Sequence, residues 1–382
     1  MKGNIIRKIY ISPSSEVFMN VIMIFPDISS EKAISNYSLH LIDNINKQGI
    51  KVDKLTYIAG KPLSFFRILK FIKNHDIIHL QHEYNLLGNY GLPFFFFLPL
   101  IKMFNRNKLI ITMHTIFSQK EKFKESILKT FFRKLLYRLQ NRIIRKFSDK
   151  VIVHSDFFKN ILIKEYYFEK EKIEVIPHGI IENVKKINKQ IARKELNLSG
   201  KIYLMIGNLI YDNGTDIILR QANKIGKTIL VATNPQPVNV RGNKARNYLK
   251  SLKEIVSQNN FENFVRFDLK DIPYSLWWKY FFASDLVLLP YRGGVGSGIF
   301  SDAMAVGKPV IASNIPYFKR IEEQYKSLKI AQNDFDFSRT IKEALIPKNY
   351  KKMESECKRY LKENGLTPVS KKYKELYLSL LE

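Results

Sequence analysis

The amino-acid sequence predicts an α/β protein of two successive doubly wound, Rossmann-like domains that face each other across a cleft. Three observations favour this fold class. The chain of 382 residues is longer than one domain with a single hydrophobic core usually is. Short aliphatic segments alternate with helical patterns, and this alternation restarts after a polar stretch that begins at residue 181. Because aliphatic strands separated by helices form parallel sheets, each domain is expected to contain one sheet covered on both faces.

The first half of the chain begins with a buried strand at 21–26, which a proline ends. A helical stripe follows at 35–49 and closes at Gly49. Further helices are expected near 63–74, in the phenylalanine-rich segment and in a long basic segment. The other expected strands of this half are 51–58, 76–82, 108–115, 149–155 and 172–179.

The second half repeats the pattern after the polar stretch 181–200. Its expected strands are 201–208, 227–233, 264–269, 285–291 and 308–313, and its expected helices lie near 215–225, 243–258, 274–283 and 298–305. The domain boundaries that follow are 1–182 for the N-terminal domain, 183–200 for a linker and 201–365 for the C-terminal domain. The last segment, 366–382, is expected to be a helix that packs back on the N-terminal domain.

Composition indicates the cellular compartment in which the protein is expected. The lone Cys357 rules out an internal disulfide framework and fits a reducing compartment. The first twenty residues contain no apolar stretch typical of a signal peptide, and the apolar run at 91–101 is shorter than the roughly 20 residues that a membrane span needs. We expect a cytoplasmic protein that can bind peripherally to the inner face of the membrane.

The formal net charge of +28 favours a negatively charged partner. It is concentrated in residues 101–150, which hold 14 Lys or Arg and 3 acidic residues. Nucleic acid, anionic lipid and a phosphorylated substrate are all candidates. The absence of an RNA-binding motif or an aromatic and basic stacking surface places nucleic acid behind lipid.

Four of the seven histidines stand at the predicted carboxyl ends of strands, where open parallel sheets bind ligands. They are His82, His114, His154 and His178. Together they indicate a polar cleft mouth, although each alone is more typical of a structural histidine whose polar atoms bond to the backbone. No Cys or His pair has the spacing of metal ligands, so no metal site is expected.

A glycine-dense loop and a short apolar helix occupy residues 291–307. Ser297 is the expected N-cap of a helix that runs to Ala305, and Gly307 is its expected stop. A helix N-terminus reached through glycines favours phosphate, because its free N–H groups and dipole attract anions. Asp302, one turn into the helix, suits ribose hydroxyls, so the segment predicts a nucleotide site unless it is simply a tight turn.

The segment 290–313 resembles the nucleotide-sugar-binding segment of family 4 glycosyltransferases, in which a glycine-rich loop, an acidic helix and Gly-Lys-Pro-Val recur. Other segments resemble that family in the same order along almost the whole chain. They are LQHEYNLLG (80–88), ITMHT (111–115), DKVIVHS (149–155), VIPHGI (175–180), GNLIYDNGTD (207–216) and ASDLVLLPY (283–291).

The resemblance implies a GT-B fold and a retaining, metal-independent transferase for surface polysaccharide or glycoconjugate synthesis. It implies no cofactor, a UDP- or GDP-linked sugar as donor substrate, and a glycan or lipid-linked acceptor. His114 is the implied catalytic residue. The implied donor-binding residues are Asn208, Asn213, Arg292, Gly296, Ser297, Gly298, Ile299 and Asp302, and the acceptor side comprises Ser35, Tyr37, His82, Glu83 and His178.

The chain departs from the family pattern at several positions. Asn208 and Asn213 stand where the family has an Arg and a Lys, and Gly294 stands where it has a sugar-contacting acid. Lys32 and Ala33 replace a glycine pair in the first loop. Neighbouring cations, Arg292 first and Lys308 second, are candidate replacements. The alternative function is a catalytically silent relative that binds a partner or a membrane.

The basic segment 126–150 predicts an amphipathic helix with nine apolar residues, from Ile127 to Ile144, on one broad face. Most of that face is expected to belong to the core. Its cationic face, beside the phenylalanine-rich run, also fits an anionic membrane surface through residues 91–150.

Overall fold

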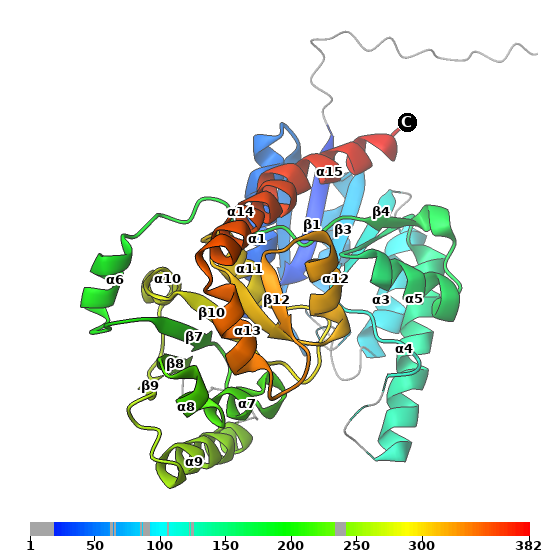
Figure 1. Cartoon of the computed structure of the whole chain (residues 1–382). Helices are drawn as coiled ribbons and strands as arrows, with labels where there is room; N and C mark the ends of the chain where they lie inside the picture. Colours follow the sequence, from blue (N-terminus) through cyan, green and yellow to red (C-terminus); the bar gives the residue numbers. More distant parts are fainter. Residues whose placement is uncertain are drawn as a thin grey trace, which may run out of the picture. The chain divides into compact units, whose positions relative to one another are not determined.

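The structure is a computed structural model that describes residues 19–61, 64, 66–84, 86, 92–104, 107–121, 123, 126–233 and 242–382. The chain divides into two compact units (Figure 1). Unit 1 comprises Met1–Gly179 and Val369–Glu382, and unit 2 comprises Ile180–Pro368. Among the described residues, no helix is long and apolar enough to cross a membrane.

Unit 1 is built on a six-stranded parallel sheet with the order β2-β1-β3-β4-β5-β6. Its strands are β1 Asn20–Pro26, β2 Lys51–Tyr57, β3 Ile77–His82, β4 Lys108–Met113, β5 Lys150–Val153 and β6 Ile173–Val175. Its helices are α1 Lys32–Lys47, α2 Phe66–Phe71, α3 Leu92–Phe104, α4 Ile127–Phe147 and α5 Asp156–Tyr166, with most of α15 Leu366–Ser379. The chain steps from β1 to β2 on one side and to β3 on the other, which makes a topological switch point beside β1.

Unit 2 has a second six-stranded parallel sheet with the order β12-β11-β10-β7-β8-β9. Its strands are β7 Ile202–Ile206, β8 Thr228–Thr233, β9 Val265–Leu269, β10 Leu286–Leu289, β11 Val310–Ser313 and β12 Leu328–Ala331. Its helices are α6 Lys189–Glu195, α7 Thr215–Leu219, α8 Ala222–Ile225, α9 Gly242–Gln258, α10 Tyr274–Ala283, α11 Gly298–Ala305, α12 Pro316–Gln324, α13 Phe337–Ala344 and α14 Pro347–Asn364. The switch point lies between β7 and β10.

The core of unit 2 consists of two apolar clusters that alternate along the strands. Leu204 of β7 belongs to one cluster, while its neighbours Tyr203 and Met205 belong to the other. Because successive side chains of a strand point to opposite faces, this alternation places one cluster on each face of the sheet. The continuous aliphatic runs in the sequence are therefore explained by a sheet with helices on both sides.

The expected strands and helices occur in the expected order, so the α/β architecture is confirmed. The sequence analysis missed α5, α12, α13, α14 and β12. The segment 183–200, expected to be a linker, contains α6. That helix belongs to unit 2, where Lys189 and Arg193 form ion pairs with Asp285 at 2.5 and 2.7 Å.

The expectation that the apolar face of α4 is core is wrong for the N-terminal half of the helix. Ile127, Leu128, Phe131 and Phe132 are 90, 66, 60 and 53% exposed. The buried residues of α4 all lie in its C-terminal half, from Tyr137 onward. Figure 1 shows the first turns of α4 extending away from the sheet of unit 1.

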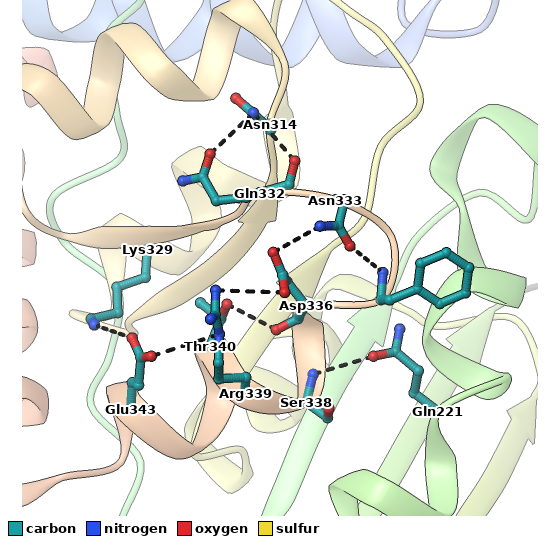
Figure 2. A network of polar contacts seen from close by, with 11 residues as sticks. Gln221, Asn314, Lys329, Gln332, Asn333, Asp336, Ser338, Arg339, Thr340 and Glu343 are labelled. Atoms are coloured by element: carbon teal, nitrogen blue, oxygen red, sulfur yellow. Dashed lines mark hydrogen bonds and ion pairs between the residues drawn. The ribbon is translucent and has the colours of Figure 1, made fainter.

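A polar network fixes the end of β12 in unit 2 (Figure 2). The Asn333 side chain donates to the Asp336 carboxylate at 3.0 Å and accepts from the Phe335 N–H at 2.9 Å. The Gln221 side chain accepts from the Ser338 N–H at 3.3 Å, which ties the start of α13 to the segment before α8. This network lets a short polar turn follow β12 and lead directly into α13.

Candidate functional site

A small open hollow lies at the carboxyl ends of β7, β8 and β10 in unit 2. Its lining includes Asn208, Asn213, Thr233 and Tyr291, all of which follow or end these strands. The hollow therefore occupies the switch point of this sheet, where ligands of open α/β proteins bind.

The glycine-rich loop leads from β10 into α11, which spans Gly298–Ala305 as the sequence predicted. The Ser297 hydroxyl accepts from the Phe300 N–H at 3.1 Å and lies 3.1 Å from the Tyr291 hydroxyl, so it caps the helix. A Cβ would meet no atom within 4 Å at three glycines of the loop, Gly293, Gly296 and Gly298. The first turn of α11 thus combines open space with N–H groups that have no intrahelical partner.

Two close backbone approaches hold this loop against its neighbours. The Ile299 side chain packs on Gly207, where a Cβ would lie 3.2 Å from Ile299 Cδ1. Gly214 has a φ of +67°, and a Cβ there would lie 1.9 Å from the Pro290 carbonyl oxygen. Only glycine fits at position 214, and this contact fixes the loop after β7 beside the end of β10.

The two asparagines expected to bind the donor differ in their surroundings. The Asn213 side-chain amide donates to the Asn208 carbonyl oxygen at 2.8 Å, so it shapes its own loop. Asn208 is exposed at the rim of the hollow. Neither asparagine brings a positive charge to the loop after β7.

Arg292, the first candidate replacement for the missing cations, is paired with an acidic residue inside unit 2. Its guanidinium makes a bidentate pair with Asp216 at 2.7 and 3.0 Å, donates to the Tyr211 carbonyl at 2.6 Å and covers the Tyr211 ring at 4.0 Å. Burial raises the pKa of Asp216, but hydrogen bonds from Arg292 and Tyr248 outweigh it and hold that pKa below its usual value. The pair lies 76 residues apart in sequence, and no sequence pattern indicated it.

Lys308 is not close to the glycine-rich loop. It is 9% exposed and its ammonium donates to the Ser284 carbonyl oxygen at 2.6 Å, just before the amino end of β10. Burial lowers its pKa to about 8. The loop follows the carboxyl end of that strand, so Lys308 is a structural residue.

Asp302 lies on α11 with one carboxylate oxygen engaged. The indole N–H of Trp277, on α10, donates to it at 3.0 Å. Burial raises the pKa of Asp302 to about 6, and the bond from Trp277 opposes that increase. The sequence analysis did not identify Trp277 as its partner, because a contact across 25 residues leaves no local pattern.

In unit 1, three of the four strand-end histidines gather around Tyr37. The His178 ring stacks on Tyr37 with centroids 4.0 Å apart, and the His114 ring meets Tyr37 edge-on at 5.5 Å. His154 Nε2 lies 3.2 Å from His114 Nδ1. His178 is exposed, while His114 and His154 are half-buried, so this cluster forms one polar surface at the carboxyl ends of the strands.

Both ring nitrogens of His114 have partners inside unit 1. Nδ1 faces His154, and Nε2 lies 2.8 Å from the Gln81 side-chain oxygen. Burial lowers the pKa of His114 well below its usual value, and the neighbouring histidines lower it further. His114 is thus a neutral imidazole at pH 7 with no unoccupied nitrogen for a proton from a substrate.

Two residues expected on the acceptor side lie elsewhere. His82 is fully buried and points to the opposite face of the sheet, where its Nε2 lies 3.4 Å from Gln140 of α4. The Ser35 hydroxyl is buried and donates to the Pro26 carbonyl at 2.6 Å and to the Glu31 carbonyl. Strand alternation explains the first error, since His79 and Gln81 occupy the face toward α15 and His82 must occupy the other.

Glu83, also expected on the acceptor side, has its hydrogen-bond partners within unit 1. It follows β3 directly and its carboxylate accepts from the Tyr84 N–H at 3.1 Å. Burial raises its pKa, which a hydrogen bond from Thr115 opposes. At the N-terminus of α1, the Glu31 carboxylate caps the helix by accepting from the N–H groups of Ala33 and Ile34.

In the described residues, no group of three His, Cys, Asp or Glu side chains is arranged to hold a metal ion.

Two protein-family models match the chain in tandem. The model described as Glycosyltransferase Family 4 matches residues 42–183, and the model described as Glycosyl transferases group 1 matches residues 186–364. Among curated proteins, Mannosylfructose-phosphate synthase of Agrobacterium fabrum is 27% identical over 195 residues. That match covers 46% of this chain and 40% of the relative, so the chain matches less than half of that protein's length.

Solved structures of similar fold cover nearly the whole chain. The structure of Anabaena Alr3699/HepE in complex with UDP has a TM-score of 0.71 at 15% identity, covering 94% of this chain and 100% of that one. Sucrose-phosphate synthase of Thermosynechococcus elongatus has a TM-score of 0.72 at 17% identity, covering 95% and 99%. At these identities the similarity shows the fold, which is the GT-B fold of two Rossmann-like domains.

Proposed function

Since the chain belongs to the family 4, group 1 glycosyltransferases, we propose that it moves a sugar from a nucleotide-sugar donor to a glycan or lipid-linked acceptor with retained anomeric configuration. The observation that carries the proposal is the hollow of unit 2 at the switch point, whose lining residues Gly207 and Tyr291 contact Ile299 and Ser297 at the start of α11. Such a site suits a ligand with phosphate groups next to a flat apolar part.

The donor is proposed to bind through three features of unit 2. The diphosphate lies at the first turn of α11, where N–H groups and the helix dipole favour anions. The ribose hydroxyls donate to the carboxylate of Asp302, which Trp277 orients. A UDP- or GDP-linked sugar is the proposed donor, and the likeness to a protein solved with UDP supports the uridine nucleotide.

Leaving-group stabilisation is proposed to rest on backbone donors. When the bond to the anomeric carbon breaks, the diphosphate gains a negative charge that fixed N–H groups can stabilise without reorganising. Arg292 supplies no charge to that step because Asp216 already pairs with it. We therefore expect a slower transferase than one that carries an Arg and a Lys at positions 208 and 213, since charged donors bind phosphate about twice as strongly as neutral ones.

The acceptor is proposed to bind at the surface of Tyr37, His114, His154 and His178 in unit 1. His178 is the exposed member of that group, and its ring is held flat on Tyr37. His114 is proposed to contact the reacting sugar, but it is assigned no proton transfer, because both of its nitrogens have protein partners. Stacked and edge-on aromatic rings next to polar atoms suit the mixed surface of a sugar.

A peripheral membrane surface on unit 1 is part of the proposal. The N-terminal half of α4 exposes apolar side chains, and Met103 of α3 is 73% exposed. Exposed cations of α4 accompany them, among them Lys129, Arg138 and Arg142. Apolar and cationic groups on one helix are typical of a segment that lies in an anionic lipid surface, which would bring the enzyme to a lipid-linked acceptor.

The transfer proposal is tested with purified protein, a panel of UDP-, GDP- and ADP-sugars, and lipid extracts as acceptors. Release of nucleoside diphosphate that depends on one donor and on acceptor supports it, and the anomeric configuration of the product is read by NMR. Nucleotide release from no donor under any acceptor condition contradicts it and leaves a catalytically silent relative as the function.

The membrane proposal is tested by sedimentation with vesicles of phosphatidylcholine alone or mixed with phosphatidylglycerol. We expect binding only to the anionic vesicles, reduced at least tenfold by the double change Phe131→Ser and Phe132→Ser. Phe335→Ser in unit 2, where the side chain is 82% exposed, is the matched control and should bind as the wild type does. Equal loss in both variants would contradict a specific surface on α4.

A further inference from the structure

A continuous series of hydrogen bonds runs through the buried part of unit 1, from the strand-end histidines to the last helix. It begins at the Ile176 carbonyl, 2.9 Å from His154 Nδ1, and continues through the 3.2 Å contact between His154 Nε2 and His114 Nδ1. The following links are His114 Nε2 to the Gln81 side chain at 2.8 Å, Gln81 to His79 Nε2 at 3.3 Å, and His79 Nδ1 to the Tyr377 hydroxyl at 2.6 Å.

The Ile176 end determines the direction of the series. A carbonyl oxygen only accepts, so His154 Nδ1 must carry a proton and donate it to Ile176. In a neutral ring the Nε2 of His154 is then an acceptor, and His114 must donate to it from Nδ1. His114 Nε2 is left with a lone pair, which needs a donor at 2.8 Å.

Gln81 is the residue that can supply this donor. Its amide nitrogen and oxygen are interchangeable in position, and the hydrogen-bond pattern decides between them. With the NH₂ group toward His114, the Gln81 oxygen faces His79 Nε2, which donates to it and to the Thr112 hydroxyl at 2.7 Å. This orientation gives up only the weak bond from the Gln81 amide to Met23 Sδ at 3.4 Å. His79 Nδ1 then accepts from Tyr377, and every link has one donor and one acceptor.

The opposite orientation of Gln81 leaves the series short of a proton. Between the Ile176 carbonyl and a Gln81 oxygen there are three hydrogen bonds, but two neutral imidazoles carry only two N–H groups. One of the rings would have to be a cation. Burial opposes this, since it lowers the pKa of His154 to about 4 and that of His114 well below its usual value.

We propose that Gln81 is a positioning residue that fixes His114 as the Nδ1–H tautomer with its ring locked in place; Gln81 is held by His79, which Tyr377 of α15 holds in turn. The inference rests on the proposed function in one respect, that His114 contacts the reacting sugar. It makes the last helix part of the site, because the Tyr377 hydroxyl is the first donor of the series.

The direct test is long-range nitrogen–proton NMR on the full chain labelled with ¹⁵N-histidine, in which only seven histidines give signals. We expect His114 to show a protonated Nδ1 and an unprotonated Nε2 at pH 7. A protonated Nε2, in either the other tautomer or a cation, overturns the proposal. This readout needs no donor or acceptor, so it stands even if no transfer activity is found.

Two variants test the individual links. Gln81→Glu places an acceptor opposite His114 Nε2, and we expect both nitrogens of His114 to become protonated; an unchanged neutral ring contradicts the role of Gln81. Tyr377→Phe keeps the packing but removes the first donor, and we expect the His79 and His114 signals to shift. Tyr84→Phe removes a buried hydroxyl that bonds Asn141 instead, and it should leave both histidines unchanged.

Activity provides a second readout. If transfer is observed, Tyr377→Phe should lower kcat about tenfold with little change in the KM for the donor, as expected when an outer hydrogen-bond partner is removed. Binding of UDP in the hollow of unit 2 should be unchanged. A wild-type kcat in Tyr377→Phe, together with unshifted His114 signals, would contradict the coupling of α15 to the site.

Discussion

Replacing Arg292 by methionine removes a cation that pairs with Asp216 inside unit 2. The guanidinium contacts both oxygens of Asp216, the Tyr211 carbonyl and the face of the Tyr211 ring. Methionine keeps much of the aliphatic volume, so the variant mainly removes charge and hydrogen bonds. The Asp216 carboxylate remains buried, with the Tyr248 hydroxyl as a remaining donor at 2.5 Å.

The expected loss of stability follows from the burial of the pair. Breaking a buried ion pair by removing one partner costs about 3–5 kcal/mol. The side chains of Arg292 and Asp216 retain 22% and 12% exposure, so we take the lower end, about 3 kcal/mol. With a urea dependence of about 2–3 kcal/mol per molar, the unfolding midpoint of unit 2 should fall by about 1 M.

Tryptophan fluorescence is the appropriate probe, because both tryptophans of the chain, Trp277 and Trp278, lie on α10 in unit 2. The double variant Arg292→Met with Asp216→Asn removes the charge that Arg292→Met leaves unpaired, and it should recover more than half of the loss. Because the folded pKa of Asp216 is lowered, the stability from this pair is present above the usual carboxyl pKa and is lost as the pH falls below it.

The reasoning is refuted if Arg292→Met unfolds at the wild-type midpoint while its affinity for nucleoside diphosphate falls sharply. That result would mean that Arg292 binds the donor phosphates directly and that the pair with Asp216 contributes nothing. An equal loss in the single and the double variant would instead contradict the unpaired carboxylate as the cause.

Three further outcomes follow from the geometry. Gly214→Ala should destabilise unit 2 and weaken nucleotide binding, since its Cβ would lie 1.9 Å from the Pro290 oxygen, whereas Gly293→Ala has open space and should match the wild type in urea unfolding. Nucleotide affinity, measured by calorimetry, should fall as the pH drops through about 6, because Asp302 takes up a proton there. In Asp302→Asn the fall near pH 6 that comes from this carboxylate should be absent, and only the change from the titration of the phosphate should remain. Lys308 has a folded pKa of about 8, below its usual 10.5, so wild-type stability should rise from pH 8 to 10 relative to Lys308→Met, by up to about 3 kcal/mol in urea titrations.

Much of the fold could be predicted because its determinants are local. The aliphatic runs of β1, β7 and β10 indicated buried parallel strands, and Ser297 and Gly307 marked the ends of α11. The strand β12 was missed because a lysine interrupts its four residues, LKIA, so it lacks the continuous aliphatic run of the equally short β10. Short strands of this kind are stabilised by pairing with β11, which is a property of the sheet rather than of the segment.

The candidate site was only partly predictable. The glycine-rich loop before α11 and the cluster of His114 and His178 were expected, since strand ends and helix caps are readable from spacing. The pairing of Arg292 with Asp216 was not, because it joins distant segments. The position of His82 could have been predicted, since period-two alternation along β3 places it on the face opposite His79 and Gln81.

The exposed N-terminal half of α4 shows that hydrophobic periodicity alone does not predict burial. Its apolar spacing is the same as that of a core helix, so periodicity predicted burial from Ile127 onward. Burial depends on what the rest of unit 1 places against the helix, and only the C-terminal half, with Tyr137 and Ile144, is packed. An amphipathic pattern therefore identified the helix correctly but not the partner of its apolar face.

The central claim, that unit 2 holds a nucleotide-sugar donor site, is tested most directly by titrating the folded protein with UDP, GDP, ADP and their sugar derivatives under tryptophan fluorescence. Trp277 donates to Asp302, so a ribose bound at Asp302 should change its emission. We expect saturable binding of one nucleotide class, which Asp302→Ala weakens at least tenfold. Failure of every nucleotide to bind at millimolar concentration, in a protein shown to be folded, would contradict the account.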